Sequence, residues 1–235
     1  MTLENLSIII PLGPGEDQLG RLMDDLNGLE LAAEIIIVSC DDIILEDSFR
    51  KFGKDSAKKY IRVIKTRQGR AQQQNAGAKA ATREFLWFLH ADSRLSERVI
   101  AALEAAIKAC PEALHYYHLK FRNDGPAGMA INEWGAWFRS EILKIPFGDQ
   151  GFCLRKDIFH QIGGFAQDAP YGEDHLLVWH ARQQGITLRC TGAALPTSAR
   201  KYAAHGWFAL TVKYQWRWIR QALPEACKLL LGRRR

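Results

Sequence analysis

An aspartate at the end of a long apolar run is the side chain of this sequence best placed for chemistry. Residues 85–89 form an unbroken apolar run, followed by His90, Ala91 and Asp92. Such a run predicts a strand buried on both faces of a parallel sheet, and ligands bind outside the carboxyl ends of these strands. At that edge, Asp92 is suited to hold a divalent metal and, through it, a phosphate. The alternative is that Asp92 caps the helix expected near Leu95.

Two acidic pairs stand where further helices are expected to begin. Glu16 and Asp17 follow the loop 12–15, whose glycines and proline leave little bulk and allow a ligand to approach the backbone closely. Glu173 and Asp174 follow a glycine at the start of another helix. Acidic side chains at this end of a helix interact favourably with its dipole. Position alone therefore leaves a purely structural role open for both pairs.

The elements that would position these residues alternate between strand and helix. Apolar runs predict strands at 6–10, 34–38, 60–64 and 85–89, and helical spacing predicts helices at about 16–29, 47–59 and 71–81. A regular β-α-β-α-β-α-β order of this kind predicts a parallel, doubly wound sheet with right-handed crossovers.

The second half of the chain is less regular. It predicts a helix at about 96–110, strands at 115–121, 152–154 and 186–191, and helices from about 157 to 163 and from 171 to 185. Between 130 and 138, Ala130, Trp134, Trp137 and Phe138 share one helical face. We expect this aromatic face to belong to the core; a platform for an acceptor is the alternative.

Composition narrows the class of protein. With 235 residues, of which 47% are apolar and 25% charged, the chain suits one globular domain with at most a small appendage. No apolar run approaches the roughly 18 to 20 residues of a membrane-spanning helix, and no secretory signal is visible. The five scattered cysteines form no C-x-x-C pair, which disfavours a zinc site or a disulfide framework. We expect reduced thiols and a cytoplasmic protein.

Several ordered motifs carry a resemblance to a known family. They are Ser7-Ile8-Ile9-Ile10-Pro11, Gly69-Arg70-Ala71 with Asn75-Ala76-Gly77, Phe88-Leu89-His90-Ala91-Asp92, Phe147-Gly148-Asp149-Gln150-Gly151, Gly163-Gly164-Phe165, Glu173-Asp174, and Thr197-Ser198-Ala199-Arg200. Together they resemble family-2 glycosyltransferases of the GT-A type, and in particular the bacterial subgroup of arsenosugar biosynthesis. The likeness extends over roughly 6–207.

The resemblance implies a fold and a division of the chain. The fold would be the α/β GT-A fold, a Rossmann-like, mostly parallel sheet flanked by helices, over residues 1–205. Residues of about 1–95 would form the donor-binding half, and about 96–205 the acceptor and catalytic half. An aromatic and basic helical tail would follow at 206–235.

The activity implied by the resemblance is inverting, metal-assisted transfer of a sugar from a nucleotide-diphospho-sugar, UDP- or GDP-linked, to an acceptor hydroxyl. Mg²⁺ or Mn²⁺ would neutralise the diphosphate at the family's Asp-x-Asp motif, which here reads His90-Ala91-Asp92. Asp92 is then the main metal ligand. His205 would complete the site, as a histidine does in some GT-A enzymes; a solvated position at the edge of the core is the alternative.

Catalytic and binding roles follow from the same motifs. Asp174 would be the catalytic base and Glu173 its helper. Gly148, Asp149 and Gln150 would line the acceptor side, with a structural turn as the alternative. The donor-binding residues implied are Pro11, Glu16, Ser39, Asp41, Arg70, Asn75, His90, Asp92 and Arg200. Ser39 stands where the family usually has an acid, for which Asp41 or Asp42 is the expected substitute.

The C-terminal tail combines aromatic and basic residues. Trp207, Tyr214, Trp216 and Trp218 alternate with Lys213, Arg217 and Arg220, and three arginines end the chain. This pattern is typical of a helix lying at an anionic membrane surface, here the inner face of the plasma membrane. A helix packed on the sheet with solvated charges is the alternative.

Two classes of function remain. The first is the glycosyltransferase. The second is a binding module that keeps the nucleotide-sugar fold without turnover, or that binds nucleic acid through its net charge of +6. A nucleic-acid site would concentrate basic residues on one face, whereas here they are spread along the chain apart from the tail. We therefore expect no nucleic-acid partner.

Overall fold

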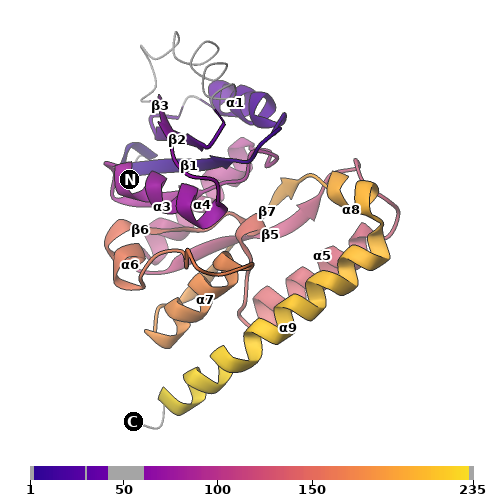
Figure 1. Ribbon diagram of the computed structural model, residues 1–235. Coiled ribbons are helices and arrows are strands. Elements are labelled where there is room, and N and C mark those ends of the chain that lie inside the picture. Colours follow the sequence, from indigo (N-terminus) through magenta and orange to yellow (C-terminus); the bar gives the residue numbers. More distant parts are fainter. Residues whose placement is uncertain (1–2, 30, 42–60, 233–235) are drawn as a thin grey trace.

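The computed structural model describes residues 3–29, 31–41 and 61–232, and it shows one seven-stranded sheet with helices on both faces (Figure 1). The strands are β1 (Leu6–Leu12), β2 (Glu34–Ser39), β3 (Ile61–Lys65), β4 (Phe85–Phe88), β5 (Leu114–Phe121), β6 (Cys153–Arg155) and β7 (Leu188–Thr197). The helices are α1 (Leu19–Gly28), α3 (Arg70–Ala80), α4 (Glu97–Ala109), α5 (Met129–Trp137), α6 (Lys156–Gln161), α7 (Glu173–Gln183), α8 (Arg200–His205) and α9 (Trp207–Gly232). The helix predicted at 47–59 lies outside the described residues.

The first four strands form the predicted parallel core. Their spatial order is β3-β2-β1-β4, and every neighbouring pair is parallel. Alternate side chains of β1 enter opposite layers: Ile8 and Ile10 pack with α1 and α4, and Ile9 packs with α3. Because both faces are covered, β1, β2 and β4 are apolar over most of their length, whereas the edge strand β3 has Arg62 and Lys65 exposed. The predicted doubly wound arrangement of this half is confirmed.

The second half adds three strands, of which only β6 runs opposite to the rest of the sheet. The short strand β6 runs antiparallel to both β4 and β5, and β7 then pairs parallel to β5 at the edge. The last strand was expected to end at 191, which is wrong. It continues to Thr197 because β7 keeps pairing with β5 beyond an irregularity near His118, as far as Phe121 opposite Thr197.

A glycine lets α3 approach the sheet closely. A Cβ on Gly77 would lie 2.5 Å from Cγ2 of Ile9 and 3.2 Å from Cγ2 of Val38. No larger residue fits there without moving β1 or the helix. This contact sets the position of the N-terminus of α3, and therefore of Arg70, relative to the carboxyl edge of the sheet.

The prediction that the aromatic face of residues 130–138 belongs to the core is wrong. Trp134 is 64% exposed and Phe138 is 40% exposed, while Met129 and Ala136 are the residues of α5 that are buried. The helix turns Met129 and Ala136 towards β5 and its aromatic side chains outward. Periodicity identified the shared face but could not say which side of the helix meets the sheet.

The C-terminal helix packs along the domain rather than extending from it. Helix α9 contacts α7 and α8, and it runs beside α5 (Figure 1). Trp218, Ala222, Ala226 and Leu229 pack against the core layer that contains α7. No helix in the described part of the chain is long and apolar enough to cross a membrane. The five cysteines, all described, are free thiols.

A buried carboxylate ties the amino-terminal edge of the sheet together. Glu34, at the start of β2, accepts hydrogen bonds from the Ser7 hydroxyl at 2.6 Å and the Thr82 amide at 2.8 Å, and it pairs with Arg62 at 3.5 Å. Burial alone would raise the pKa of Glu34, but these donors outweigh it and hold the pKa below its usual value.

We predict that Glu34→Ala lowers the free energy of unfolding by about 2–3 kcal/mol, because it leaves buried donors without an acceptor. Since the folded-state pKa is lowered, the contribution of Glu34 is present at neutral pH and is lost as the pH falls through that value. Urea unfolding at several pH values should show the two proteins converging in acid. Glu84→Ala, at an exposed position, is the control and should change stability by less than about 0.5 kcal/mol. A stability difference between the wild type and Glu34→Ala that is the same at all pH values would contradict the stabilising role of the Glu34 carboxylate.

Candidate active site

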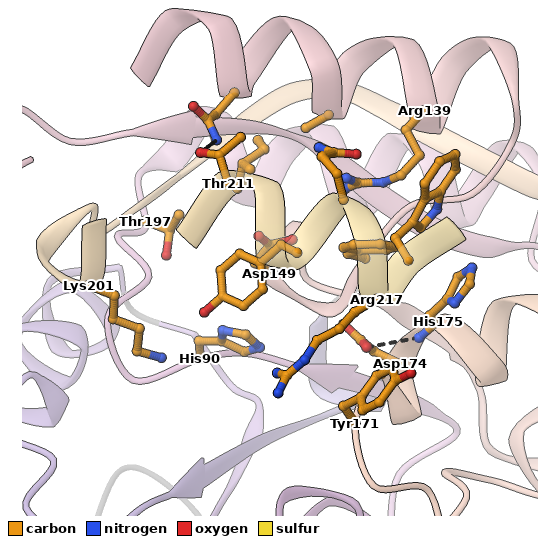
Figure 2. Close-up of a pocket in the computed structure, with 18 of the residues that line it drawn as sticks. His90, Arg139, Asp149, Tyr171, Asp174, His175, Thr197, Lys201, Thr211 and Arg217 are labelled. Atoms are coloured by element: carbon orange, nitrogen blue, oxygen red, sulfur yellow. Dashed lines mark hydrogen bonds between the residues drawn. The ribbon is translucent and has the colours of Figure 1, made fainter. Parts of the chain in front are cut away.

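A cavity of about 300 Å³ opens at the carboxyl edge of the sheet, between β4, β5, β7 and the helices α5, α7 and α9 (Figure 2). Its charged lining consists of three carboxylates and four basic side chains: Asp92, Asp149, Asp174, Arg70, Arg139, Lys201 and Arg217. Asp92 and Asp174, which are far apart in the sequence, therefore face the same space.

Asp174 is held in place by backbone amides. Its Oδ2 accepts a hydrogen bond of 2.6 Å from the Gly148 amide, and its Oδ1 accepts one of 2.9 Å from the His175 amide. A Cβ on Gly148 would lie 2.6 Å from an Nη2 of Arg70 and 2.9 Å from Asp174 Oδ2. A side chain at position 148 would therefore displace Arg70 or Asp174, because three elements meet there: the loop 147–151, α3 and α7.

Asp92 lies on the opposite wall of the cavity, after β4. The Thr197 hydroxyl, at the end of β7, donates a hydrogen bond of 3.2 Å to its Oδ1. Burial raises the pKa of Asp92, and the nearby Lys201 ammonium acts in the opposite direction. The carboxylate has one protein hydrogen-bond donor and faces the cavity, so it can accept a further cationic ligand.

Asp149 is a third carboxylate in the same space. Its Oδ1 is buried and has no hydrogen-bond partner among the residues that the structure describes. Burial raises the pKa of Asp149, whereas the positive charge of Arg139 lowers it. Arg139 is itself fixed, with its guanidinium 3.5 Å from the centre of the Phe147 ring and its Nε donating to the Ile145 carbonyl. A buried oxygen without a donor marks Asp149 as a position for a bound cation or hydroxyl group.

Arg70 contacts a residue close in sequence to each of the two acids Asp92 and Asp174. Its guanidinium contacts Nε2 of His90, and its Nε lies 3.3 Å from a carboxylate oxygen of Glu173. Burial, together with the charges of Arg70 and Lys201, lowers the pKa of His90 well below its usual value. The imidazole is therefore neutral and accepts from Arg70. His90 and Glu173 together hold a positive charge at the cavity.

Helix α9 closes the cavity and is fixed to the loop before Asp174. His175 accepts a hydrogen bond of 2.7 Å from the Trp179 indole at Nε2, so its Nδ1 carries the proton donated to Gln221 Oε1 at 2.8 Å. Gln221 in turn donates to the Tyr171 carbonyl, and the Arg217 guanidinium lies over the Tyr171 ring. The C-terminal segment therefore belongs to the wall of the site.

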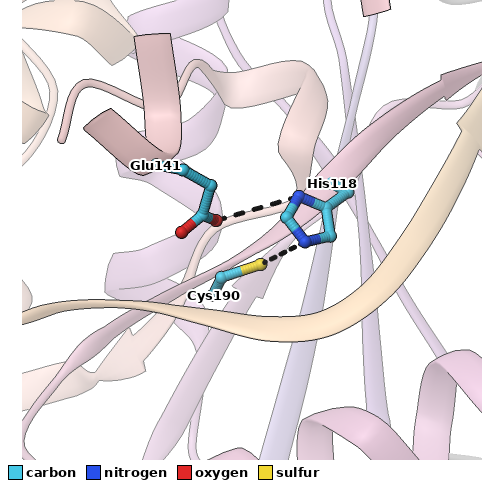
Figure 3. Close-up of side chains that lie close together, drawn as sticks. All are labelled: His118, Glu141 and Cys190. Atoms are coloured by element: carbon cyan, nitrogen blue, oxygen red, sulfur yellow. Dashed lines mark hydrogen bonds and ion pairs between the residues drawn. The ribbon is translucent and has the colours of Figure 1, made fainter. Parts of the chain in front are cut away.

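A second group of potential metal ligands lies outside this lining. Glu141 is 3.8 Å from Nδ1 of His118, and the Cys190 thiol is 3.5 Å from Nε2 of the same ring (Figure 3). It is the one set of three such side chains that are mutually close within the described residues. Because these residues do not face the cavity, we assign them no part in its chemistry.

Comparison with models of known families identifies the family of the chain. A model described as "Glycosyl transferase family 2" matches residues 7–167, which is more than half of the chain. The chain belongs to glycosyl transferase family 2. The family match covers β1, the segment around Arg70, Asp92 and the loop 147–151, although not Asp174. No curated protein sequence matched the chain.

Solved structures share the GT-A fold of this family-2 glycosyl transferase. TarS residues 1–349 from S. aureus aligns with a TM-score of 0.63 at 16% identity, covering 83% of this chain and 60% of TarS. The complex of the same TarS fragment with UDP-GlcNAc aligns with a TM-score of 0.62 at 16% identity, covering 83% of this chain and 58% of the fragment. The mannosyltransferase PcManGT from Pyrobaculum calidifontis, in complex with GDP-Man and Mn²⁺, aligns with a TM-score of 0.73 at 16% identity. The alignment covers 97% of this chain and 68% of PcManGT. The chain thus spans about 60% of TarS residues 1–349, and 36% of the longer TarS structure.

The structure brings only some of the predicted donor residues to the cavity. Arg70, His90 and Asp92 line it. Asn75 does not: its side chain donates to the Phe165 carbonyl at 2.8 Å and accepts from the Phe165 amide at 3.0 Å, so both of its polar groups hold the turn 163–165. Arg200 pairs with Glu16 at 2.7 Å and with Asp17, which closes the first loop over the start of α8.

The remaining predicted donor residues lie at the ends of β1 and β2, outside the cavity lining. Pro11 pairs with Val38 within the sheet. Ser39 is fully buried and accepts a hydrogen bond of 3.0 Å from the Asp41 amide. Their donor-binding role stays a prediction.

Of the predicted metal and acceptor residues, too, only some lie at the cavity. His205 does not join Asp92: it is exposed, and its Nδ1 lies 3.0 Å from the Lys201 carbonyl. Asp149 faces the cavity, and Gly148 holds Asp174. Gln150 is fully buried and bridges the Tyr117 carbonyl and the Phe147 amide, so it supports the turn instead. Glu173 does not line the cavity but pairs with Arg70.

Several lining residues were not predicted as site residues. Arg139 follows the aromatic helix that was assigned to the core, and Lys201 follows a quoted motif by one position. Tyr214, Arg217 and Gln221 come from the tail. The tail carried a usable signal, because polar residues on one face of an otherwise aromatic helix indicate a face that meets a polar site.

Asn75→Ala should act on stability, because it removes two hydrogen bonds to a partly buried backbone. We expect the free energy of unfolding to fall by about 1–3 kcal/mol, measured by urea denaturation. Asn123→Ala, at an exposed position, is the matched control and should change stability by less than about 0.5 kcal/mol. An unchanged stability with a selective loss of nucleotide binding would instead favour the donor-binding role.

Proposed function

We propose that this protein is an inverting glycosyltransferase that moves a sugar from a nucleotide-diphospho-sugar to an acceptor hydroxyl with the help of a divalent metal. The observation that carries the proposal is that Asp92 and Asp174 line one cavity, together with Arg70 and Lys201. Membership of glycosyl transferase family 2 supports the same reaction.

Asp174 is the proposed catalytic base. It would take the proton of the acceptor hydroxyl as that oxygen forms a bond to the anomeric carbon. The bond from this carbon to the diphosphate oxygen breaks in the same step, and the diphosphate leaves with the electron pair. Attack from the face opposite the leaving group inverts the anomeric configuration. The Gly148 amide keeps one carboxylate oxygen fixed, so the proton acceptor has a defined position.

The departing diphosphate needs positive charge on its side of the cavity. Arg70, held by the neutral His90 and by Glu173, supplies a fixed guanidinium there, and Lys201 supplies an ammonium beside Asp92. Cations positioned before the reaction stabilise developing charge at little cost in reorganisation. This arrangement gives a physical reason for histidine at the first acidic position of the motif: it orients Arg70 instead of binding the metal.

The donor set at Asp92 fits Mg²⁺ or Mn²⁺. Both ions favour carboxylate oxygens, and Asp149 offers a buried oxygen that lacks a protein donor in the same cavity. We propose Asp92 as the main ligand and Asp149 as the second. When bound, the metal would add charge neutralisation at the diphosphate.

The donor class rests on the related structures. TarS is seen with UDP-GlcNAc and PcManGT with GDP-Man and Mn²⁺, which supports a UDP- or GDP-linked sugar and a divalent ion here. Membership of the arsenosugar-biosynthesis subgroup, and a place in the cytoplasm, remain parts of the proposal that rest on the sequence motifs and composition.

Asp174→Asn should lower the rate of sugar transfer by at least about a hundredfold, because the amide cannot accept the proton. Binding of the donor should be retained. Transfer is measured with labelled UDP-GlcNAc and GDP-mannose, and binding by isothermal titration. Asp168→Asn changes an exposed aspartate six residues earlier and should leave both unchanged. Full activity of the Asp174 variant would refute the assignment of the base, and binding without turnover by the wild type would favour the non-catalytic alternative.

Asp92→Asn should weaken Mn²⁺ binding by more than about tenfold, since a charged ligand becomes a neutral one. The amide oxygen still accepts from Thr197, so the fold should be kept. Titration of Mn²⁺ in the presence of UDP or GDP, followed by electron paramagnetic resonance, measures the affinity directly. The Asp168→Asn protein again serves as the control, and equal Mn²⁺ affinity in all three proteins would exclude Asp92 as the ligand.

A further inference from the structure

Every exposed large apolar side chain in the described residues lies on one of two adjacent segments. The first segment is α5 with the π-helical turn η3 (Phe138–Ile142) and Leu143, and the second is α9. The residues are Ile131, Trp134, Trp137, Phe138, Ile142, Leu143, Phe208, Val212, Tyr214, Trp216, Ile219, Leu223, Leu230 and Leu231. Apolar residues scattered singly on a surface are ordinary, but a gathered set marks an interaction site.

On α9 five of the exposed apolar residues form one stripe on the side away from the domain, whereas Tyr214 lines the cavity. Phe208, Val212, Trp216, Ile219 and Leu223 follow at intervals of four, four, three and four, which places them on one helical face. The opposite face carries Leu210 and Leu229, which are buried. The helix is therefore apolar on both sides, although only one side packs against other described residues.

The stripe on α9 continues onto α5. Asn132 accepts a hydrogen bond of 2.6 Å from the Trp207 indole and donates one of 3.1 Å to the Thr211 hydroxyl, so the two helices lie side by side (Figure 1). On α5 and η3, Ile131, Trp134 and Phe138 are spaced three and four apart, and the last two rings are stacked at 5.9 Å. We call the exposed apolar residues of α5 and η3, together with the stripe on α9, the outer helix surface.

The charges around the outer helix surface have one sign. From Trp207 to the C-terminus the sequence holds seven basic residues and a single acid, Glu225. Glu225 is 6% exposed and is bonded to Lys228 and Gln183. Lys213 and Arg220 are exposed and flank the stripe. On α5 and η3, Glu133 and Glu141 are partly buried and paired with lysines.

We propose that the outer helix surface docks on an anionic lipid bilayer, with α9 lying in the plane of the interface. Tryptophan and basic side chains around an apolar stripe favour that location, where the rings sit at the level of the headgroups and the cations meet lipid phosphates. A second copy of the chain fits less well, because it would bring the same basic residues together, and the described residues of α5, η3 and α9 include no exposed acid to neutralise them.

Docking would bring the cavity to the membrane. The inner faces of the same helices contribute Asn132, Arg139, Tyr214 and Arg217 to its lining. An acceptor hydroxyl carried by a membrane lipid would then be delivered between α5 and α9 to Asp174. This consequence rests on the proposed glycosyltransferase function, whereas the docking itself does not.

Co-sedimentation of the full chain with vesicles tests the docking. Binding to vesicles of phosphatidylcholine with 30% phosphatidylglycerol should greatly exceed binding to phosphatidylcholine alone and should weaken with salt. Trp134→Gln with Trp216→Gln should weaken binding by about tenfold or more. Lys213→Glu with Arg220→Glu should weaken it by about thirtyfold or more. Arg98→Glu with Lys108→Glu makes the same change of net charge on exposed positions of α4 and should have little effect.

Each result decides the proposal. Wild-type protein that stays in the supernatant with anionic vesicles would overturn it, as would equal loss of binding in the α4 control. A wild-type dimer in sedimentation velocity that the tryptophan substitutions convert into a monomer would assign the surface to a second copy instead. Circular dichroism and melting temperature confirm that each variant is folded.

A transfer assay separates the acceptor from the docking. With labelled UDP-GlcNAc or GDP-mannose and vesicles of total bacterial lipid, label should enter the organic phase with the wild type and not with Asp174→Asn. Label found only in water-soluble products would overturn the lipid acceptor. Vesicle binding without any transfer would count against the proposed function and leave the docking in place.

Discussion

The hydrogen bond from the Gly148 amide to the Asp174 carboxylate is the contact on which the site depends. It joins the loop after α5 and η3 to the first turn of α7, and the space around it is so limited that a Cβ at position 148 would overlap Arg70 and Asp174. The contact therefore fixes the base, the nearest guanidinium and the turn that carries Asp149 at once. Three elements from distant parts of the sequence acquire one geometry through a single backbone amide.

Charge balance is the second constraint. Three carboxylates in one cavity repel one another, and burial raises the pKa of Asp92 and Asp149. Arg70, Arg139, Lys201 and Arg217 offset this repulsion without pairing tightly with all three acids. Glu173 and the neutral His90 hold Arg70, while the stacked Phe147 ring holds Arg139. The acids thus remain available to a ligand because their neutralising charges are anchored elsewhere.

Sequence patterns predicted the strands, and the family resemblance implied a common site for Asp92 and Asp174; the roles of individual side chains were predicted less well. Buried parallel strands are continuous apolar runs, so β1, β2 and β4 are visible directly, and the fold implies that their carboxyl edges share a cleft. The predicted roles of individual side chains were wrong where one sequence pattern is compatible with two different structures. Asn75 and Gln150 are polar residues in motifs, but they bond backbone groups that only the folded chain brings near them. Trp134 shares its helical face with other aromatic residues, yet periodicity does not reveal which face meets the sheet.

Helix α9 shows why the tail could not be assigned from its composition alone. A helix that packs on a domain usually has one apolar face, whereas α9 has two, with a line of polar residues between them that enters the cavity. Gln221 bonds both His175 and the Tyr171 carbonyl, directly beside the base, while Trp216 and Leu223 on the same helix face outward. Packing against the core accounts for the apolar residues of the inner face, and the cavity accounts for the line of polar residues. Neither accounts for the apolar residues of the outer face. Because one rigid helix carries all three, whatever covers its outer face also lies next to the group that would accept the proton.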